Sequence, residues 1–433
     1  MNQSVGSSVI SRLCLAHDLF RTPLTLAMPP IILTFSDWYL PGSKGGGAVT
    51  ALVNLIELLG DDYDFRVVTR NRDLGDACPY QDLPAGQWTC TGKARVLYTG
   101  RITPWGLLRR VREVGPAVIY LNSFFSRFTI QTLLLRRLRL LPRASVILAP
   151  RGELFPAALA IKARRKRMYR RIVSMLRLWR DVIWQASSAL EREHIASVLR
   201  CHGGEDQATV VLSTDVPDSG LAHVPPGGHR PEKRPGRLSL LFLSRIGPQK
   251  NLLFLLELLN SLEGEIKLDL YGPVDDAAFW DKCQQRIREL PLNIRVAYRG
   301  PVASDRVMQV FGAHHFQILP TLGENFGYAI LEALASGCPV MTSDRTPWRD
   351  LERLGAGWDL PLEARDRWIA ALKSCVEMGQ GAYQQMSRRA RAFFEEWTST
   401  APFRAEAINL FQFALAWGLR SEEQTYRDSL KQV

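Results

Sequence analysis

The sequence predicts an α/β protein of two domains, each with a parallel sheet whose strands alternate with helices. Short apolar runs that end in polar or glycine residues recur along the chain, with helical patterns between them. This alternation is typical of a parallel, doubly wound sheet. The 433 residues exceed what one hydrophobic core comfortably holds. A proline- and glycine-rich stretch at 214–237 interrupts the pattern and predicts a linker between the domains.

The composition is that of a globular protein, and the charge predicts an anionic partner. Hydrophobic residues make up 46% of the chain and the net charge is +12, which favours an anionic surface, substrate or nucleic acid. No nucleic-acid motif accompanies the charge, so we expect no nucleic-acid partner. Seven scattered cysteines without a Cys-x-x-Cys pair predict reduced thiols. Neither a spanning apolar run nor a clean signal-peptide core is present, so we expect a cytoplasmic protein.

The N-terminal half should contain an extension at 1–29 and a first domain at 30–213. A glycine-rich turn with Gly46 and Gly47 follows the first strand; it could admit a phosphate, and a flexible loop is the alternative. Asn122 and Arg151 follow two later strands, at the edge where open α/β sheets bind ligands. The expected strands are 31–35, 65–69, 95–98, 118–121, 146–149 and 182–185.

The second domain, expected at 238–400, begins with a strand followed by Arg245 and Lys250 on either side of a glycine turn. A guanidinium and an ammonium at a strand end could converge on a diphosphate, and ordinary surface charge is the alternative. A later strand, 266–271, ends at Gly272. Residues 401–433 carry an amphipathic helical pattern, and this helix could pack back on the first domain.

The stretch 319–340 reads as a strand, a glycine-bearing loop, a short helix and a new strand. Loop amides and a helix N-terminus favour phosphate. Glu324 in the loop and Glu332 on the helix lie eight positions apart, and carboxylates can accept hydrogen bonds from sugar hydroxyls. Solvated glutamates in an ordinary turn are the alternative.

This stretch resembles the Glu-x7-Glu signature of the GT4 family of retaining glycosyltransferases. The resemblance is carried by Gly-Glu-Asn-Phe-Gly, the second glutamate, and Ala-x-Gly-x-Pro-Val. It runs from about residue 31 to about 400 and is strongest between 241 and 351. It implies the GT-B fold, in which two Rossmann-like domains with parallel sheets face each other across a cleft. The later segments resemble a subgroup that acts in bacterial surface polysaccharide assembly, of the lipopolysaccharide kind.

The resemblance implies transfer of a sugar from a nucleotide diphosphate-sugar to a saccharide or lipid-linked acceptor, with retention of anomeric configuration. It assigns Glu324 to the donor sugar, and Arg245 and Lys250 to the diphosphate, in place of a metal ion; we therefore expect neither a metal nor a cofactor. The strand before Arg151 lacks the family's cleft histidine, so Arg151 and Asn122 become the substrate-binding candidates. The donor-binding set is Glu332, Asn325, Phe326, Gly327, Gly323, Gly46, Gly47 and Gly272.

A basic segment from Lys162 to Arg180 interleaves cationic and apolar residues. A basic amphipathic helix can lie on an anionic membrane surface, which predicts a peripheral position on the inner face of the membrane. A core helix with solvated arginines is the alternative. Two other functions also remain open: a GT-B sugar-nucleotide epimerase, and a non-enzymatic basic scaffold at the membrane.

Overall fold

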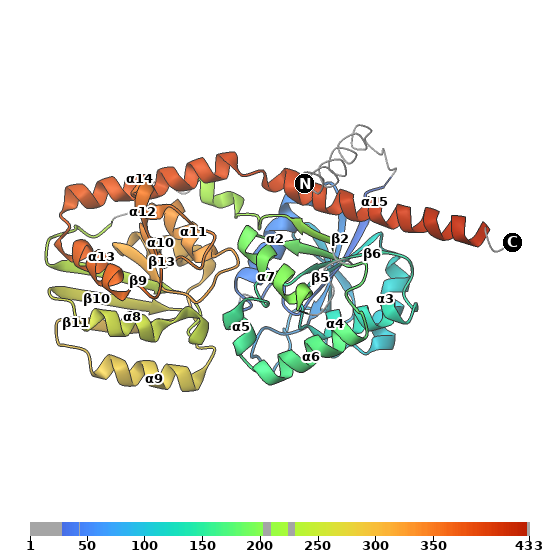
Figure 1. Cartoon of the computed structure of the whole chain (residues 1–433), viewed down its shortest axis with the longest axis horizontal. Helices are drawn as coiled ribbons and strands as arrows, with labels where there is room; N and C mark the ends of the chain where they lie inside the picture. The colour runs from blue at the N-terminus through green and yellow to red at the C-terminus, as the bar shows by residue number, and fades with distance from the viewer. Residues whose placement is uncertain (1–27, 43, 202–208, 224–229, 431–433) are drawn as a thin grey trace, which may run out of the picture.

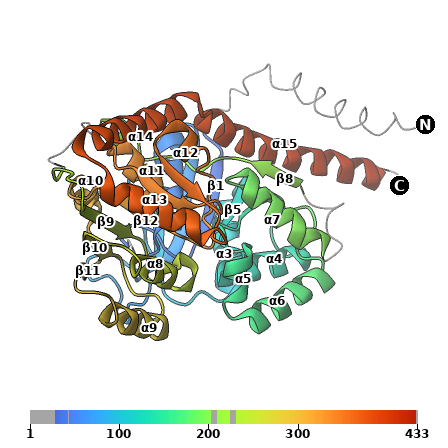
Figure 2. The ribbon, with the colours of Figure 1, turned by 60° about the vertical axis from the view of Figure 1, so that its left-hand side comes forward.

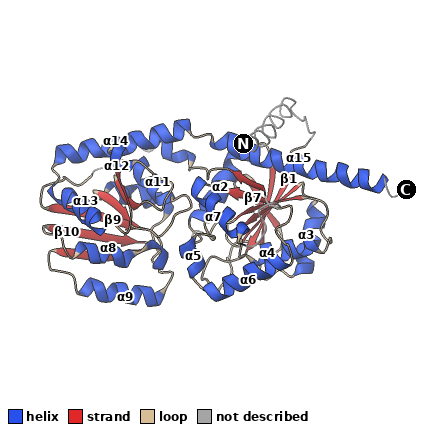
Figure 3. Cartoon of the chain, in the orientation of Figure 1, coloured by secondary structure: helices blue, strands red, loops and turns tan. Residues whose placement is uncertain are grey.

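The computed structural model describes residues 28–42, 44–201, 209–223 and 230–430, and two α/β domains lie next to each other in it (Figure 1). The N-terminal domain holds an eight-stranded sheet and the C-terminal domain a six-stranded one. Figure 3 shows helices around the strands of both sheets. The predicted class, α/β with two domains built on parallel sheets, is confirmed. The expected extension at 1–29 and the Pro225–Gly228 centre of the expected linker fall almost wholly outside the described residues.

The N-terminal sheet has the order β3-β4-β2-β1-β5-β6-β7-β8, and its ladders are parallel except for the antiparallel pair β3–β4. The chain builds outward from β1 in one direction and from β5 in the other, so the order reverses between β1 and β5. Every residue of β5 and β6 is buried, as expected for strands covered on both faces. The strands are β1 Ile31–Ser36, β2 Asp64–Arg70, β3 Trp88–Thr91, β4 Ala94–Thr99, β5 Val118–Asn122, β6 Ser145–Ala149, β7 Ile183–Ala186 and β8 Thr209–Leu212.

Side-chain caps fix where several N-terminal-domain helices begin. Thr103, Ser126 and Ser188 accept hydrogen bonds from backbone amides in the first turn of α3, α4 and α7, which satisfies donors that a helix leaves unpaired. The helices are α2 Gly47–Leu59, α3 Pro104–Val114, α4 Arg127–Arg137, α5 Pro156–Ala160, α6 Ala163–Met175 and α7 Ala189–Arg200.

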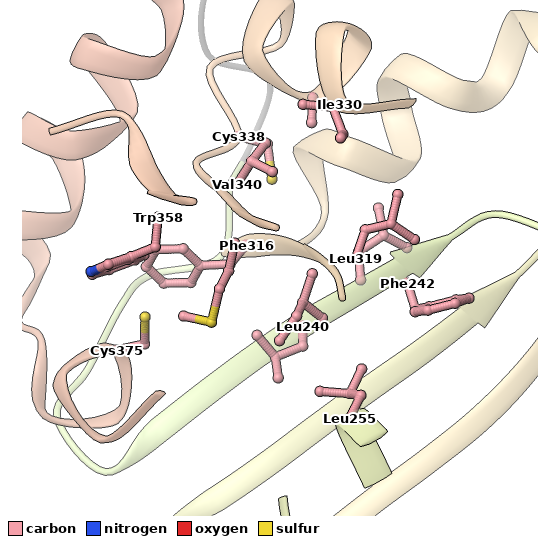
Figure 4. Packing of buried hydrophobic residues seen from close by; sticks show 14 of the residues in the cluster. Leu240, Phe242, Leu255, Phe316, Leu319, Ile330, Cys338, Val340, Trp358 and Cys375 are labelled. Carbon is pink, nitrogen blue, oxygen red and sulfur yellow. The ribbon is translucent and has the colours of Figure 1, made fainter. Parts of the chain in front are cut away.

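The C-terminal sheet is parallel throughout, in the order β11-β10-β9-β12-β13-β14, and reverses between β9 and β12. Its core is apolar on both faces; Figure 4 shows Leu240, Phe316 and Val340 from adjacent strands packed together. The strands are β9 Arg237–Leu243, β10 Glu265–Tyr271, β11 Ile294–Gly300, β12 Phe316–Leu319, β13 Val340–Ser343 and β14 Gly357–Leu360. The helices are α8 Leu252–Leu259, α9 Ala277–Arg288, α10 Val307–Gly312, α11 Tyr328–Ala335, α12 Leu351–Leu354 and α13 Arg365–Glu377, with 3-10 turns η3 Ser219–His223, η4 Pro248–Lys250 and η5 Ser304–Arg306.

The last two helices join the domains. α14 (Gln380–Thr400) packs on α11 of the C-terminal domain, and α15 (Phe403–Leu430) crosses to the N-terminal domain, as Figures 1 and 2 both show. Phe411 of α15 lies with its ring centroid 5.3 Å from that of Tyr63 and 5.7 Å from that of Phe65. The Ser145 hydroxyl donates to the Ala414 carbonyl at 2.6 Å. This part of the 401–433 segment therefore contributes to the N-terminal core.

Three strands were not expected from the sequence: β3, β8 and β14. Each has only four residues, and β3 and β8 lack the continuous burial that marks a central strand. All three lie at the edges of their sheets, where pairing with one neighbour suffices. Across the described residues, no helix is long and apolar enough to cross a membrane.

Candidate functional site

A cleft of about 470 Å³ lies between the two domains, at the carboxyl ends of the strands where both sheet orders reverse. Open α/β sheets bind ligands at such switch points, because the loops after the two diverging strands separate there. Arg245 follows β9, and Glu324 follows β12. The structure brings together on the wall of this cleft Arg245, Lys250, Glu324, Asn325, Phe326, Gly327, Glu332, Gly46, Gly47 and Arg151.

Lys250 and Glu324 meet because the turn after β9 is bonded to the loop after β12. The Gln249 carbonyl accepts from the Leu322 amide at 2.8 Å, and the Gln249 side chain donates to the Gly323 carbonyl at 3.0 Å. Lys250 Nζ forms an ion pair with the Glu324 carboxylate, and the two side chains are only 14% and 11% exposed. A cation and a carboxylate are thus held in place before any ligand binds.

Arg245 lies nearer the solvent, where its Nη1 atom is 3.1 Å from Asp275 Oδ2. Asp275 is itself held by its amide, which donates to the Ile246 carbonyl at 2.9 Å. A guanidinium has further N–H donors beyond those that one carboxylate can accept. Arg245 can therefore contact an anion in the cleft and keep its bond to Asp275.

The loop before α11 presents backbone amides to the cleft. Gly327, the residue that precedes α11, has φ 84° and ψ 62°, a left-handed conformation that favours glycine. Among the described residues, nothing accepts a hydrogen bond from the amides of Asn325, Phe326 or Gly327. The Glu324 amide, by contrast, donates to the Arg345 carbonyl at 3.0 Å. The amides after Glu324 and the N-terminus of α11 are therefore available to bind an anionic ligand.

Glu332 lines the same cleft from α11. Burial of its carboxyl, with a smaller contribution from the charge of Asp218, raises the pKa of Glu332 from 4.5 to about 8. The group therefore holds a proton at neutral pH and can donate a hydrogen bond as well as accept one.

This raised pKa predicts a pH-dependent stability. The folded protein keeps the Glu332 proton up to a pKa of about 8, whereas the unfolded chain loses it near pH 4.5. The free energy of unfolding should therefore fall as pH rises through that window, by at most about 1.4 kcal/mol per pH unit. Burial also raises the pKa of Glu153 and Glu191, so urea unfolding at about pH 5.5 and about pH 8 should show a larger loss in the wild type than in Glu332→Gln. Parallel losses in both proteins would contradict it.

The N-terminal wall of the cleft is built on glycines that let the domains approach. Gly46, which precedes α2, has φ 62° and ψ −144°, a conformation open almost only to glycine. A Cβ atom on Gly47 would lie 3.3 Å from the Tyr328 ring, and one on Gly152 would lie 3.1 Å from Asn325 Cβ. Side chains at these positions would push the two walls apart.

Arg151 and Asn122 do not present free polar groups to the cleft. The Arg151 guanidinium is 6% exposed and forms an ion pair with Asp215, which is 4% exposed. It also donates to the Tyr120 hydroxyl at 2.6 Å and to Asn122 Oδ1 at 3.1 Å. The Arg151 guanidinium and the Asn122 side-chain oxygen are thus used within the protein, and the Asn122 amide nitrogen is buried outside the cleft lining.

The Asn325 side chain also turns toward the N-terminal domain. With its amide nitrogen facing Glu191, it donates to Oε2 of that carboxylate at 2.7 Å, and the Ser187 hydroxyl donates to its oxygen at 2.7 Å. Glu191 accepts in addition from the Gly152 amide at 2.7 Å. The contribution of Asn325 to an anion site is therefore its backbone amide, while its side chain joins the domains.

Gly323 and Gly272 lie outside the cleft lining and have packing roles. A Cβ atom on Gly323 would come within 2.8 Å of the Phe155 ring, and one on Gly272, at φ 132°, within 2.0 Å of the Ser244 carbonyl oxygen. The Gly323 amide is engaged by the Thr321 hydroxyl at 3.3 Å. Phe326 is buried against Trp348, with ring centroids 5.5 Å apart, and offers only its amide.

Glu153 and Lys166 are among the cleft residues that had no site role in the sequence interpretation. Glu153 accepts from the Ser123 hydroxyl at 2.7 Å and the Phe124 amide at 2.6 Å, which holds the loop after β5. Lys166 lines the cleft from α6 and donates to the Ala158 carbonyl at 2.7 Å. The position of Glu153 just beyond β6 was the available signal. Within the described ranges, no group of three or more His, Cys, Asp or Glu side chains could hold a metal ion.

Comparisons with known proteins agree with this architecture. Residues 229–393 match the family model described as Glycosyl transferases group 1. HepE from Anabaena, solved with UDP-glucose, is 16% identical with a TM-score of 0.62, over 90% of this chain and 99% of HepE. WaaG, a glycosyltransferase involved in lipopolysaccharide biosynthesis, is 12% identical with a TM-score of 0.58, over 88% and 99%. Sucrose-phosphate synthase from Thermosynechococcus elongatus is 15% identical with a TM-score of 0.56, over 93% and 100%.

No curated protein sequence matches the chain. At these identities the structural similarity establishes a shared fold, GT-B, over both domains.

Proposed function

We propose that this protein transfers a sugar from a nucleotide diphosphate-sugar to a saccharide or lipid-linked acceptor, with retention of anomeric configuration, as GT4 enzymes do. Its place would be the cytoplasm and its role the synthesis of cell-surface polysaccharide. The family match over the C-terminal domain supports sugar transfer. WaaG and the outer core galactosyltransferase WaaB, two structural neighbours named for lipopolysaccharide synthesis, support the polysaccharide role.

One observation carries the proposal. Lys250, Glu324 and three residues whose amides have no acceptor among the described residues line one cleft at the switch point of the C-terminal sheet. Cations and amides suit a diphosphate, and a fixed carboxylate suits sugar hydroxyls. HepE, which has the same fold, was solved with UDP-glucose.

The proposed step needs charge stabilisation above all. The acceptor hydroxyl oxygen bonds to the anomeric carbon while the bond from that carbon to the β-phosphate oxygen breaks. Negative charge grows on the departing diphosphate, and Lys250, Arg245 and the amides after Glu324 are suited to stabilise it. The acceptor's proton passes to the departing phosphate oxygen on the same face of the sugar. Glu324 orients the sugar for this displacement.

A donor screen tests the proposal. We expect one class among UDP-, GDP- and ADP-sugars to raise the melting temperature, because a ligand that binds the folded state stabilises it. The same donor, incubated with a saccharide or lipid-linked acceptor library, should yield a glycosylated product. The product should form in the presence of a chelator, since we propose that cationic side chains take the place of a metal. If no nucleotide-sugar binds the folded protein, the proposal fails.

The same assay separates transfer from epimerisation. An epimerase would release a free sugar epimer from the donor alone, whereas a transferase needs an acceptor to form its product. A scaffold without enzymatic activity would bind no donor.

Replacing Lys250 by methionine should weaken donor binding about 10- to 100-fold, because the variant keeps the aliphatic stem and loses the charge. Calorimetric titration with the donor found in the screen measures the loss. Lys282→Met on α9, an exposed position away from the cleft, is the matched control and should bind as the wild type does. Equal affinity for the wild type and Lys250→Met would remove Lys250 from the diphosphate site.

A further inference from the structure

Helix α6 is almost wholly unburied. Of its thirteen residues only Val173 is buried. Met168 and Met175 are 61% and 75% exposed, and Ile172 between them is also exposed. These three side chains follow the i, i+4, i+7 spacing of one helix face. Val173 and Tyr169 pack against the core of the N-terminal domain, so this stripe is a second, exposed apolar face on a helix that also contributes to the core.

Arginines surround this apolar stripe. α6 contains five arginines and no acidic residue. None of the five forms an ion pair with another described residue. Arg164 and Arg171 each lie one turn before a methionine of the stripe, so they emerge on the same side of the helix. We call this surface the α6 face and define it by Arg164, Arg167, Met168, Arg171, Ile172 and Met175.

The only lysine of α6 is turned away from this face. Lys166 donates to the Ala158 carbonyl and lies 4.8 Å from the centroid of the Phe125 ring. The surface continues past α6 to exposed Leu138 at the end of α4, where the Arg137 side chain donates to the Leu176 carbonyl at 3.0 Å. α6 and the end of α4 are thus joined at one edge of the N-terminal domain, where Figure 1 places both helices.

We propose that the α6 face binds an anionic lipid surface. Met168, Ile172 and Met175 would enter the boundary between head groups and acyl chains, and the arginines would contact anionic head groups. Aliphatic side chains favour lipid over nucleic acid, which is bound through aromatic stacking as well as charge; the one aromatic residue of α6, Tyr169, is partly buried and donates to the Phe124 carbonyl.

The N-terminal end of α6 lies next to the cleft. Ile161, just before α6, is exposed and lines the cleft, and α5 lies between α6 and the C-terminal domain in Figure 1. A protein bound through the α6 face would hold the cleft opening beside the lipid. The inference itself does not depend on glycosyl transfer, because lipid binding is measured without a donor or an acceptor.

Vesicle co-sedimentation of the full-length protein tests the proposal. We expect binding to vesicles of phosphatidylcholine with phosphatidylglycerol and little binding to phosphatidylcholine alone. The triple variant Arg164→Glu, Arg167→Glu, Arg171→Glu should lower the partition coefficient about 100-fold or more. The variant Met168→Gln, Ile172→Gln, Met175→Gln should lower it about tenfold or more, because the apolar contribution is lost. Melting temperatures near the wild-type value establish that both variants fold.

A charge-matched control separates this face from the overall basic charge. Lys282→Glu, Arg288→Glu, Arg295→Glu makes the same change in net charge on exposed positions of the C-terminal domain and should bind anionic vesicles nearly as the wild type does. The proposal is overturned if this control loses binding as fully as the α6 arginine variant. It is also overturned if the α6 arginine variant binds as the wild type does. The same holds if the apolar variant binds as the wild type does, because a surface that binds through its arginines alone would bind any polyanion.

Discussion

Replacing Glu324 by alanine should abolish sugar transfer, with kcat lowered by about 10³-fold or more, and should leave the fold in place. The carboxylate is fixed beside Lys250 before the donor arrives, so its loss removes a positioned group at the reacting sugar and not merely a surface charge. The loop keeps its shape without this side chain, because the Glu324 amide bonds to the Arg345 carbonyl and the Gln249 side chain bonds to the Gly323 carbonyl. Steady-state kinetics with the donor identified in the screen measure the loss.

Two further variants sharpen this test. Glu324→Gln keeps the size of the side chain and removes its charge, so a similar loss would assign the effect to the carboxylate. Glu363→Ala removes an exposed carboxylate that pairs with Arg345, the residue whose carbonyl accepts from the Glu324 amide, and this variant should turn over normally. Near-normal turnover in Glu324→Ala, with an unchanged circular dichroism spectrum, would refute the central assignment.

Replacing Asp215 by alanine should lower the free energy of unfolding by about 3–5 kcal/mol, because it leaves the buried Arg151 guanidinium without its counter-charge. The pair is almost fully buried, and the remaining bonds of Arg151, to Tyr120 and Asn122, come from neutral groups. Urea unfolding followed by tryptophan fluorescence measures the loss. The double variant Arg151→Met, Asp215→Leu should lose less than Asp215→Ala, since it buries no unpaired charge.

Asp62 offers the matched control for this prediction. It pairs with Arg404 of α15, also across distant parts of the chain, but both side chains are well exposed. Asp62→Ala should therefore change the free energy of unfolding by no more than about 1 kcal/mol. Equal losses from Asp62→Ala and Asp215→Ala would show that burial does not increase the contribution of the Arg151–Asp215 pair to the free energy of unfolding.

The elements that build the cleft could be predicted because their signals are local. Each predicted strand is a short apolar run followed by a polar or glycine residue, and Lys250 and Glu324 each stand just after such a run. Parallel strands place these ends at one edge of a sheet, so the two residues were expected near each other. The edge strands β3 and β8 were not predicted because a partly exposed strand of four residues has no clear apolar pattern. β14 is mostly buried, but it is also only four residues long and begins at a glycine.

The buried ion pair of Arg151 could not be predicted, because it depends on a residue far away in the sequence. Its position after β6 suggested a ligand contact, but its partner Asp215 comes 64 residues later, beyond β8. The Arg151 backbone is left-handed, with φ 54°, which sets the direction of the side chain and leaves no mark in the sequence. Gly272 and Gly323 show a related limit. A side chain at either position would clash with the Ser244 carbonyl or the Phe155 ring, and these neighbours are known only from the folded structure.

The backbone passes between the domains twice, once through the segment that contains Val216 and once between α14 and α15. The Val216 carbonyl accepts from the Asn54 side chain of one domain and from the Tyr328 hydroxyl of the other, at 2.9 and 3.0 Å. Two connections restrict the relative motion of two domains more than one connection would, and the bonds of the Asn325 side chain to Ser187 and Glu191 add a third link between the domains. Lys250 and Glu324 both belong to the C-terminal domain, so their mutual spacing does not depend on how the two domains are placed relative to each other.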